Sequence, residues 1–165
     1  MPSLRGWRPY HACLEVFGQC CDRDGFRLVE YSVQSNHLHL LVEGDDRTAV
    51  SRGLQRLKSM LARKLNKLFG RRGKLWSDRY HDRVLRTLRE VRNALLYVLA
   101  NFKKHCSAGI DPRHPDPCSS GPWFGGWIED VAPPGVPCPV AQAQSWRMIE
   151  GWLRHGLLSL REAPA

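Results

Sequence analysis

The spacing of apolar residues predicts one helix followed by two strands at the start of the chain. From Tyr10 to Cys21 the apolar positions recur at helical spacing with few helix breakers. Residues 26–33 and 37–43 instead alternate between apolar and polar side chains, which is typical of half-buried strands. The short link 34–36 suits a hairpin turn, so we expect the two strands to pair as an antiparallel unit.

A long helix is predicted next. Apolar residues at steps of three and four continue to about Phe69, and Gly70 provides a signal for the end of the helix. Asp46 or Thr48 stands at the beginning of this stretch, and either side chain can cap a helix N-terminus. We therefore expect a helix of about six turns after the second strand.

Another strand and another helix are predicted before residue 110. The segment from Tyr80 to Arg86 reads as a strand, and a helix is expected from about Leu88 to His105. Thr87 and Glu90 have the spacing of a capping box at the start of that helix. Helices and strands in this order predict an α+β domain over residues 1–110.

The composition changes sharply after residue 110. Eight of the eleven prolines lie between residues 111 and 139, a stretch that also holds Trp123 and Trp127. Such a segment wraps or links rather than forming regular elements. Helical spacing returns over residues 141–160, although Gly151 and Gly156 weaken it. We predict that residues 111–165 form an extension with a C-terminal helix.

The strand over residues 37–43 carries a pattern that suggests chemistry. Its alternation puts His37, His39, Leu41 and Glu43 on one face, with apolar residues on the other. Two imidazoles side by side on a strand can hold one metal ion. A bare pair of this kind is more often just two polar residues on a half-solvated strand. The remaining motifs decide between these interpretations.

Tyr97 has an unusual position on the predicted helix over residues 88–105. The apolar residues of that helix fall within one arc, and Tyr97 lies on the opposite side, with Asn93 and Asn101 one turn away in either direction. A tyrosine ring lying on a surface is the common explanation. Two neighbouring amides also suit a reactive hydroxyl, with Asn101 as an additional metal ligand or phosphate contact.

Charge and cysteine content narrow the class of protein. The 165 residues carry a net charge of +9, which favours a polyanionic partner, nucleic acid ahead of an anionic membrane surface. No apolar run has the length of a membrane span, and no signal-peptide core is present. The six cysteines contain no CxxC pair, so they are expected to be free thiols in a soluble cytoplasmic protein.

Most of the positive charge lies in one segment. Between residues 47 and 74 there are ten cations and no acidic residue, and such a run repels itself unless a polyanion balances it. The residues expected to contact DNA are nine of these ten cations together with Lys104. They are Arg52, Arg56, Lys58, Arg63, Lys64, Lys67, Arg71, Arg72, Lys74 and Lys104.

Four segments within residues 25–127 resemble the HUH single-tyrosine transposases, in particular the branch called REP-associated tyrosine transposases. They are YSVQSNHLHLLVE, LWSDRYHDRVL, VRNALLYVLANFKKH and PWFGGW. The resemblance implies a ferredoxin-like antiparallel sheet with packed helices. It also implies that His37 and His39 bind a divalent metal, Mg²⁺ or Mn²⁺, that Tyr97 is the nucleophile and that Asn101 is the third ligand.

The function implied by the resemblance is nicking and strand transfer of single-stranded DNA at hairpins, through a 5′-phosphotyrosine intermediate. The basic helix and the tryptophans would hold the strand, and a monomer is expected, with a homodimer as the alternative. Two other interpretations remain: a DNA-binding remnant of such a transposase without catalysis, and a structural or RNA-associated basic protein in which the two histidines are incidental.

The sequence departs from this family at its N-terminus. The family opens with a strand that precedes the first helix and pairs with the histidine strand, whereas nothing before Tyr10 alternates like a buried strand. We therefore expect the N-terminal strand to be missing. Its loss would leave unpaired backbone groups on the histidine strand and on the strand near residues 80–86, and with them poor solubility or marginal stability.

Overall fold

The structure of the protein is a computed structural model that describes residues 2–76, 80–100, 102 and 113–164. It confirms the predicted α+β class and is consistent with the expected ferredoxin-like arrangement. The elements of the first hundred residues are α1 (Trp7–Cys20), β1 (Asp22–Arg23), β2 (Phe26–Val33), β3 (Leu38–Gly44), α2 (Arg47–Leu68) and α3 (Leu88–Ala100). The later elements are η1 (Gly121–Trp123), α5 (Trp146–Ile149) and η2 (Gly151–His155).

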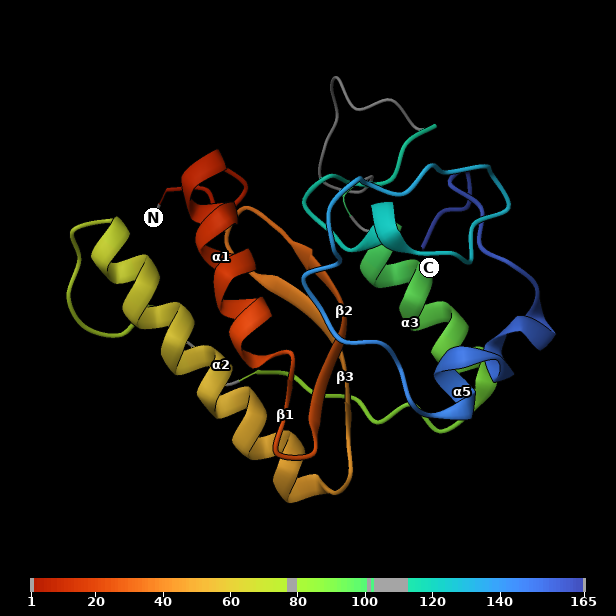
Figure 1. Ribbon diagram of the computed structural model, residues 1–165, viewed down its shortest axis with the longest axis horizontal. Coiled ribbons are helices and arrows are strands. Elements are labelled where there is room, and N and C mark those ends of the chain that lie inside the picture. The colour runs from red at the N-terminus through yellow and green to blue at the C-terminus, as the bar shows by residue number, and fades with distance from the viewer. Residues whose placement is uncertain (1, 77–79, 101, 103–112, 165) are drawn as a thin grey trace.

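The three strands form one antiparallel sheet in the order β1-β2-β3. In the β2–β3 pair, Ser32 lies opposite His39 and Tyr31 lies opposite Leu40, with an irregularity between Leu28 and Glu30. Helices α1 and α2 cover one face of the sheet and α3 lies over the other (Figure 1). The alternation of β3 therefore sends Leu38, Leu40 and Val42 toward α1 and α2, and His39 and Leu41 toward α3.

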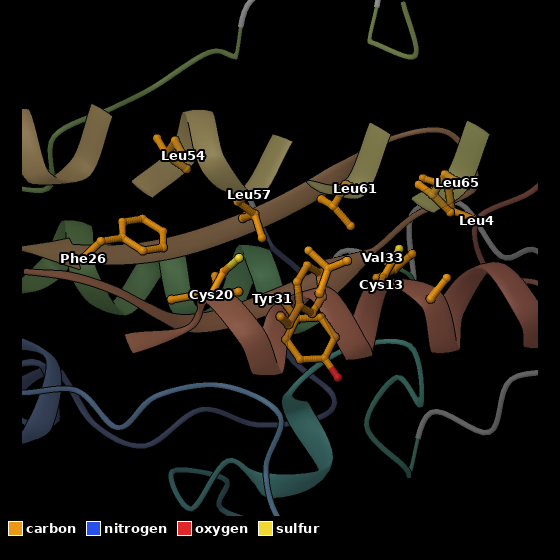
Figure 2. Packing of buried hydrophobic residues seen from close by; sticks show 14 residues of the cluster. Leu4, Cys13, Cys20, Phe26, Tyr31, Val33, Leu54, Leu57, Leu61 and Leu65 are labelled. Atoms are coloured by element: carbon orange, nitrogen blue, oxygen red, sulfur yellow. The ribbon is translucent and has the colours of Figure 1, made fainter. Parts of the chain in front are cut away.

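The face under α1 and α2 holds the larger core. Tyr31 and Val33 of β2 are fully buried there between the two helices, together with Phe17 of α1 and Leu61 of α2 (Figure 2). The Tyr31 hydroxyl meets the hydroxyl of Tyr10 at 3.0 Å, which gives this buried polar group a partner. The apolar stripes that predicted α1 and α2 are the surfaces that pack here.

The face under α3 holds a second core, and the C-terminal part of the chain supplies four of the eleven described residues that are buried in it. Leu95 and Leu99 of α3 pack with Leu41 of β3, and Trp127 and Trp152 close the cluster. The Trp127 indole N–H donates to the carbonyl of Gly121 at 2.9 Å. Trp127 is only 6% exposed, so its predicted role in contacting DNA bases is wrong. The apolar surface of α3 requires a cover, and Trp127 is part of it.

On the edge of β2 opposite β3, the short strand β1 pairs with Phe26 and Arg27, and residues 116–141 close the rest. Val33 N–H donates to Cys118 O at 2.8 Å, and Ser120 N–H donates to Tyr31 O at 3.0 Å. Farther along the strand, Ala141 N–H donates to Leu28 O at 2.9 Å. The proline-rich segment thus satisfies backbone groups that would otherwise be open on β2.

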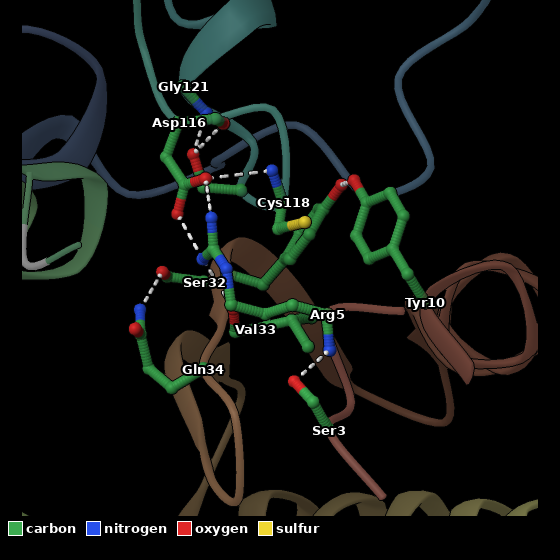
Figure 3. A network of polar contacts seen from close by, with 11 residues as sticks. Ser3, Arg5, Tyr10, Ser32, Val33, Gln34, Asp116, Cys118 and Gly121 are labelled. Carbon is green, nitrogen blue, oxygen red and sulfur yellow. Dashed lines mark hydrogen bonds and ion pairs between the residues drawn. The ribbon is translucent and has the colours of Figure 1, made fainter. Parts of the chain in front are cut away.

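An ion pair holds this segment to the N-terminal residues. The Arg5 guanidinium donates to both carboxylate oxygens of Asp116, at 2.8 and 2.6 Å, and also to the carbonyl of Val33 at 2.9 Å (Figure 3). Asp116 is fully buried and also accepts from the Cys118 N–H. A buried carboxylate with this many donors is well compensated, and it orients the chain that pairs with β2.

The predicted ends of α2 and the predicted start of α3 are confirmed. The Asp46 carboxylate accepts from the Ala49 N–H at 2.7 Å, and Gly70 has a φ of 62°, the left-handed conformation that ends α2. At the start of α3, Glu90 N–H donates to Thr87 Oγ1 at 3.2 Å, and Thr87 N–H donates back to the Glu90 carboxylate at 2.9 Å. This reciprocal pair is the capping box. Residues 103–105 of the predicted helix lie outside the described residues.

The predicted strand from Tyr80 to Arg86 is wrong, because these residues form no regular element. A strand requires a neighbour for its backbone groups. In the part of the chain that the structure describes, no strand pairs with the outer edge of β3, and none lies beside residues 80–86. The expected absence of a strand before α1 agrees with this arrangement, since residues 2–6 contain no strand either.

The predicted C-terminal helix over residues 141–160 is also wrong. The structure has two short pieces there, α5 and η2, which meet between Ile149 and Gly151. Gly151 packs closely against Leu88 and Trp146, with no room for a side chain, and Gly156 has a φ of 86°. Glu150, which lies between the two pieces, has a non-helical φ of −129°, so no continuous helix runs through Glu150 and Gly156.

Candidate active site

The His37–His39 pair lies at the beginning of β3, on the sheet face that α3 covers. The two Nε2 atoms are 3.0 Å apart, and the rings meet edge to face with their centroids at 4.7 Å. Both side chains are partly exposed. The i, i+2 spacing on a strand therefore produces the convergence of ring nitrogens that the sequence predicted.

The hairpin turn before β3 orients the first histidine. His37 Nδ1 lies 2.8 Å from Asn36 Oδ1. The turn itself is closed by the Gln34 N–H, which donates to His37 O at 2.9 Å, and by the Leu4 N–H, which donates to Ser35 O at 2.8 Å. In the sequence, Asn36 is recognisable only as part of the 34–36 turn, and the signal of a further role is its place directly before the first histidine.

Tyr97 reaches this histidine pair from α3. Its ring stands edge to face with the ring of His39, with the centroids 4.9 Å apart and an interplanar angle of 75°. The side chain is 38% exposed, although its helix neighbours Leu96 and Val98 are buried. The exposed side of α3 that carries Tyr97 therefore lies next to the beginning of β3. The predicted nucleophile and the predicted metal ligands are thus found in one partly open site.

The geometry of the two histidines fits a metal ion. An ion that lies about 2.1 Å from each imidazole nitrogen, and holds the two ligands at the right angle of an octahedral site, has those nitrogens about 3.0 Å apart. The observed separation of Nε2 atoms is 3.0 Å. Without an ion, the same distance is that of an N–H···N hydrogen bond between the rings. His37 and His39 would thus hold an ion through Nε2 with little rearrangement.

No third ligand is identified by the described part of the chain. In residues 2–76, 80–100, 102 and 113–164, no three His, Cys, Asp or Glu side chains gather in one place. The predicted third ligand, Asn101, lies outside the described residues, as does Lys104. The role of Asn101 accordingly stays a prediction.

Glu43 shares the histidine face of β3 but has a structural task. Its carboxylate accepts from the N–H groups of Gln144 and Ser145, at 2.8 and 3.1 Å, and from Arg27 at 3.4 Å. Burial alone would raise the pKa of Glu43, but these donors and the Ser145 hydroxyl outweigh it, so the pKa is lowered. Glu43 anchors the chain that leads into α5.

The structure corrects the prediction that the basic segment has no counter-charge. Arg56 pairs with Asp24 at 2.8 Å, and Lys64 pairs with Glu15, so α1 and the β1–β2 turn neutralise two of the cations. The exposed cations of α2 that remain for an external anion include Arg52, Arg63 and Lys67. Because α2 covers the opposite face of the sheet from α3, these cations are not beside Tyr97 (Figure 1).

The connection between α2 and α3 starts against α2. Lys58 places its ammonium group 5.6 Å from the centre of the Tyr80 ring, and its carbonyl accepts from the Trp76 indole N–H at 3.4 Å. Leu85 then packs with the core under α3. Tyr80 is 45% exposed and lies beside Lys58 on α2, so it is not grouped with the histidine pair.

Comparison with known protein families gives one result. Residues 5–98 match the family described as "Transposase IS200 like". The match covers more than half of the 165 residues and includes His37, His39 and Tyr97. The chain therefore belongs to the IS200-like transposases, enzymes that cut and move DNA. Searches of the curated proteins and of the solved structures gave no match.

One further finding concerns membranes. Among the residues that the structure describes, no helix is both long enough and apolar enough to cross a bilayer.

Proposed function

We propose that this transposase nicks and rejoins single-stranded DNA, with Tyr97 as the nucleophile and with His37 and His39 as ligands of a divalent metal ion. The observation that carries the proposal is the edge-to-face contact of Tyr97 with His39, at 4.9 Å between ring centres. It brings a partly exposed phenol to a pair of imidazole nitrogens that can hold one ion.

Tyr97 performs the covalent chemistry in this proposal. Its Oη attacks a backbone phosphorus, and the new O–P bond forms as the bond from phosphorus to the 3′ oxygen breaks. The phenol proton is transferred to that oxygen, so one strand end leaves as a 3′-hydroxyl while the other stays attached as a 5′-phosphotyrosine. Attack by an incoming 3′-hydroxyl reverses the steps. One phosphoester replaces another, so no nucleotide cofactor is consumed.

The histidines position the second component of the site. A divalent ion, when bound, would polarise the phosphate and assist the departing oxygen as a Lewis acid. His37 and His39 would hold it through their Nε2 atoms, leaving positions for the Asn101 amide, water and phosphate oxygens. Imidazole ligands suit softer ions than Mg²⁺, so we expect Mn²⁺ to serve at least as well as Mg²⁺.

We infer that the substrate is single-stranded DNA that folds into a hairpin, as the resemblance to the REP-associated branch implies, and that a monomer binds it. The strand would run from Tyr97 to the exposed cations of α2 around an edge of the sheet. Residues 116–141 and β1 occupy one edge of β2, and no strand of the described residues pairs with the outer edge of β3, so we place the DNA strand along β3. Phosphates would meet Arg52, Arg63 and Lys67 at its end.

A covalent-adduct assay tests the proposal. A hairpin oligonucleotide with single-stranded flanks is incubated with protein and Mn²⁺, then separated on a denaturing gel. Label on the 3′ end should migrate with the protein, and label on the 5′ end should leave on a shorter strand that ends in a 3′-hydroxyl. If the 5′ label travels with the protein, the polarity is reversed. If neither label does, for every hairpin tested with Tyr97 intact, the chain is not a tyrosine strand transferase.

A further inference from the structure

We propose that Asn36 is a positioning residue, which fixes the His37 ring in the tautomer that can bind a metal ion. The inference rests on the proposed metal-binding function of the His37–His39 pair. It starts from two distances: 2.8 Å from Asn36 Oδ1 to His37 Nδ1, and 3.0 Å from His37 Nε2 to His39 Nε2.

The first distance determines where the proton is. An amide oxygen has lone pairs and no hydrogen, so it can only accept. His37 Nδ1 must therefore carry the hydrogen that Asn36 Oδ1 receives. In the neutral ring only one nitrogen is protonated, which leaves a lone pair on His37 Nε2.

The second distance shows where that lone pair points. His37 Nε2 faces His39 Nε2, and an ion between the two rings would receive it. Neutral histidine in water favours the other tautomer, with its hydrogen on Nε2, which cannot bind a metal there. A hydrogen bond from Nδ1 to an acceptor on the protein is the usual means of holding a ligand histidine in the competent form.

Asn36 itself is held by backbone contacts on both sides of the turn. Leu4 N–H donates to the carbonyl of Ser35, and Gln34 N–H donates to the carbonyl of His37. Leu4 is fully buried in the core under α1 and α2, so the turn is tied to that core. The amide oxygen is therefore presented to the ring in advance of metal binding, rather than recruited by it.

Asn36 and Ser35 provide a matched set of variants. Asn36→Ala removes the acceptor. Asn36→Asp keeps an acceptor and cannot donate, so it also tests which end of the amide faces the ring. Ser35→Ala changes the neighbouring residue of the same turn, whose described contact is made by its backbone carbonyl.

Two measurements on the full chain separate this inference from the proposed function. Nitrogen-15 NMR of the imidazoles, at a pH well above the ordinary histidine value of about 6.5, reports the His37 tautomer without any metal. Isothermal titration with Mn²⁺ alone reports the affinity. We expect the hydrogen on Nδ1 in the unaltered protein, in Asn36→Asp and in Ser35→Ala, and on Nε2 in Asn36→Ala, with Mn²⁺ affinity about 10- to 100-fold lower in the last.

The outcomes that oppose the inference are distinct. An unchanged tautomer in Asn36→Ala overturns it, and so does a changed tautomer with undiminished Mn²⁺ affinity. A hydrogen on Nε2 in the unaltered protein that moves to Nδ1 in Asn36→Asp would also overturn it, because it would mean that the amide nitrogen, not the oxygen, faces the ring. Absence of Mn²⁺ binding in the unaltered protein would refute the metal role in the proposed function, while the tautomer measurement would still decide whether Asn36 sets the ring.

Discussion

The ring of Tyr97, on α3, stands edge to face with the ring of His39, on the strand β3 that α3 covers. His39 is fixed by the pairing of β3 with β2, and Tyr97 is fixed by the packing of α3 on that sheet. Any change that tilts α3 therefore alters the distance between phenol and imidazoles. The second core, under α3, positions the site as much as the histidine strand does.

Replacing Tyr97 by phenylalanine should abolish the covalent DNA adduct and leave hairpin binding within a few-fold, because only the hydroxyl is removed. The adduct is measured on denaturing gels and the binding by fluorescence anisotropy. Tyr80→Phe is the control, since Tyr80 lies beside Lys58 on α2 and should keep full activity. Adduct formation that persists in Tyr97→Phe would place the nucleophile elsewhere.

Replacing His37 and His39 together by alanine should remove Mn²⁺ binding and strand cleavage at the same time. A single amide with water cannot retain a labile divalent ion well once both imidazoles are gone. Calorimetry with Mn²⁺ checks the first loss and the adduct assay checks the second. If the double variant binds Mn²⁺ with unchanged affinity, the ion sits at another place on the protein.

Neutralising Arg52, Arg63 and Lys67 should weaken binding to all single strands alike. If each contacts one phosphate, the slope of log affinity against log salt should become shallower by about 2, at about 0.7 for each contact. Arg56 and Lys64 form the matched control, because both are already paired with carboxylates and should change the slope much less. Equal slopes for the two sets would show that α2 does not lie on the DNA path.

Glu30 should make stability depend on pH. Its carboxyl is desolvated beneath the chain at Ser120, whose hydroxyl donates to it, and burial raises its pKa from 4.5 to about 8. Below both values the group is protonated in both states and contributes no pH dependence. Between them the unfolded chain releases a proton that the folded protein keeps, so stability falls as pH rises, by up to about 1.4 kcal/mol per unit.

The Glu30→Gln variant isolates this effect. Glutamine cannot ionise, so the unfolding free energy of the variant should fall less between about pH 5 and pH 8. The difference is the contribution of the single proton that Glu30 retains in the folded state. Urea melts at a series of pH values measure it. Identical pH profiles for the two proteins would show that the Glu30 carboxyl ionises as readily in the folded state as in the unfolded chain.

Two helix glycines should respond to alanine in opposite directions. A Cβ on Gly53 of α2 would lie 2.1 Å from the Phe26 ring, so Gly53→Ala should destabilise the protein by roughly 1–3 kcal/mol through overpacking. Gly18 of α1 has nothing within 4 Å of an added Cβ, and Gly18→Ala should stabilise by roughly 0.5–1 kcal/mol. Chemical denaturation checks both, and a loss of stability in Gly18→Ala would contradict this account of α1.

Much of the fold could be predicted because its signals are local. The alternation of β3, the caps at Asp46 and Thr87 and the stop at Gly70 each depend on a few neighbouring residues, and all appear in the structure. The meeting of Tyr97 with His39 is not local. It followed from combining a strand face with a helix face, together with the resemblance to a family.

The errors arose where distant parts of the chain decide the outcome. Residues 80–86 have the composition of a strand, but no strand of the described part of the chain pairs with them. Trp127 was expected to hold the DNA strand, yet it packs in the core under α3. Arg56 and Lys64 seemed unbalanced because their carboxylate partners lie on α1 and in the β1–β2 turn. None of these contacts leaves a signal in the local sequence.

The closing of β2 by residues 116–141 has a consequence for the order in which the chain is made. On the ribosome, β2 and β3 leave the exit tunnel long before their protecting segment, at a synthesis rate of about 5–20 residues per second. For several seconds the edge of β2 and the apolar side of α3 are uncovered, and the ion pair between Arg5 and Asp116 cannot yet form. The nascent protein is therefore most vulnerable to misassembly in the interval before its last third emerges, and a message interrupted there would release a chain with an open sheet.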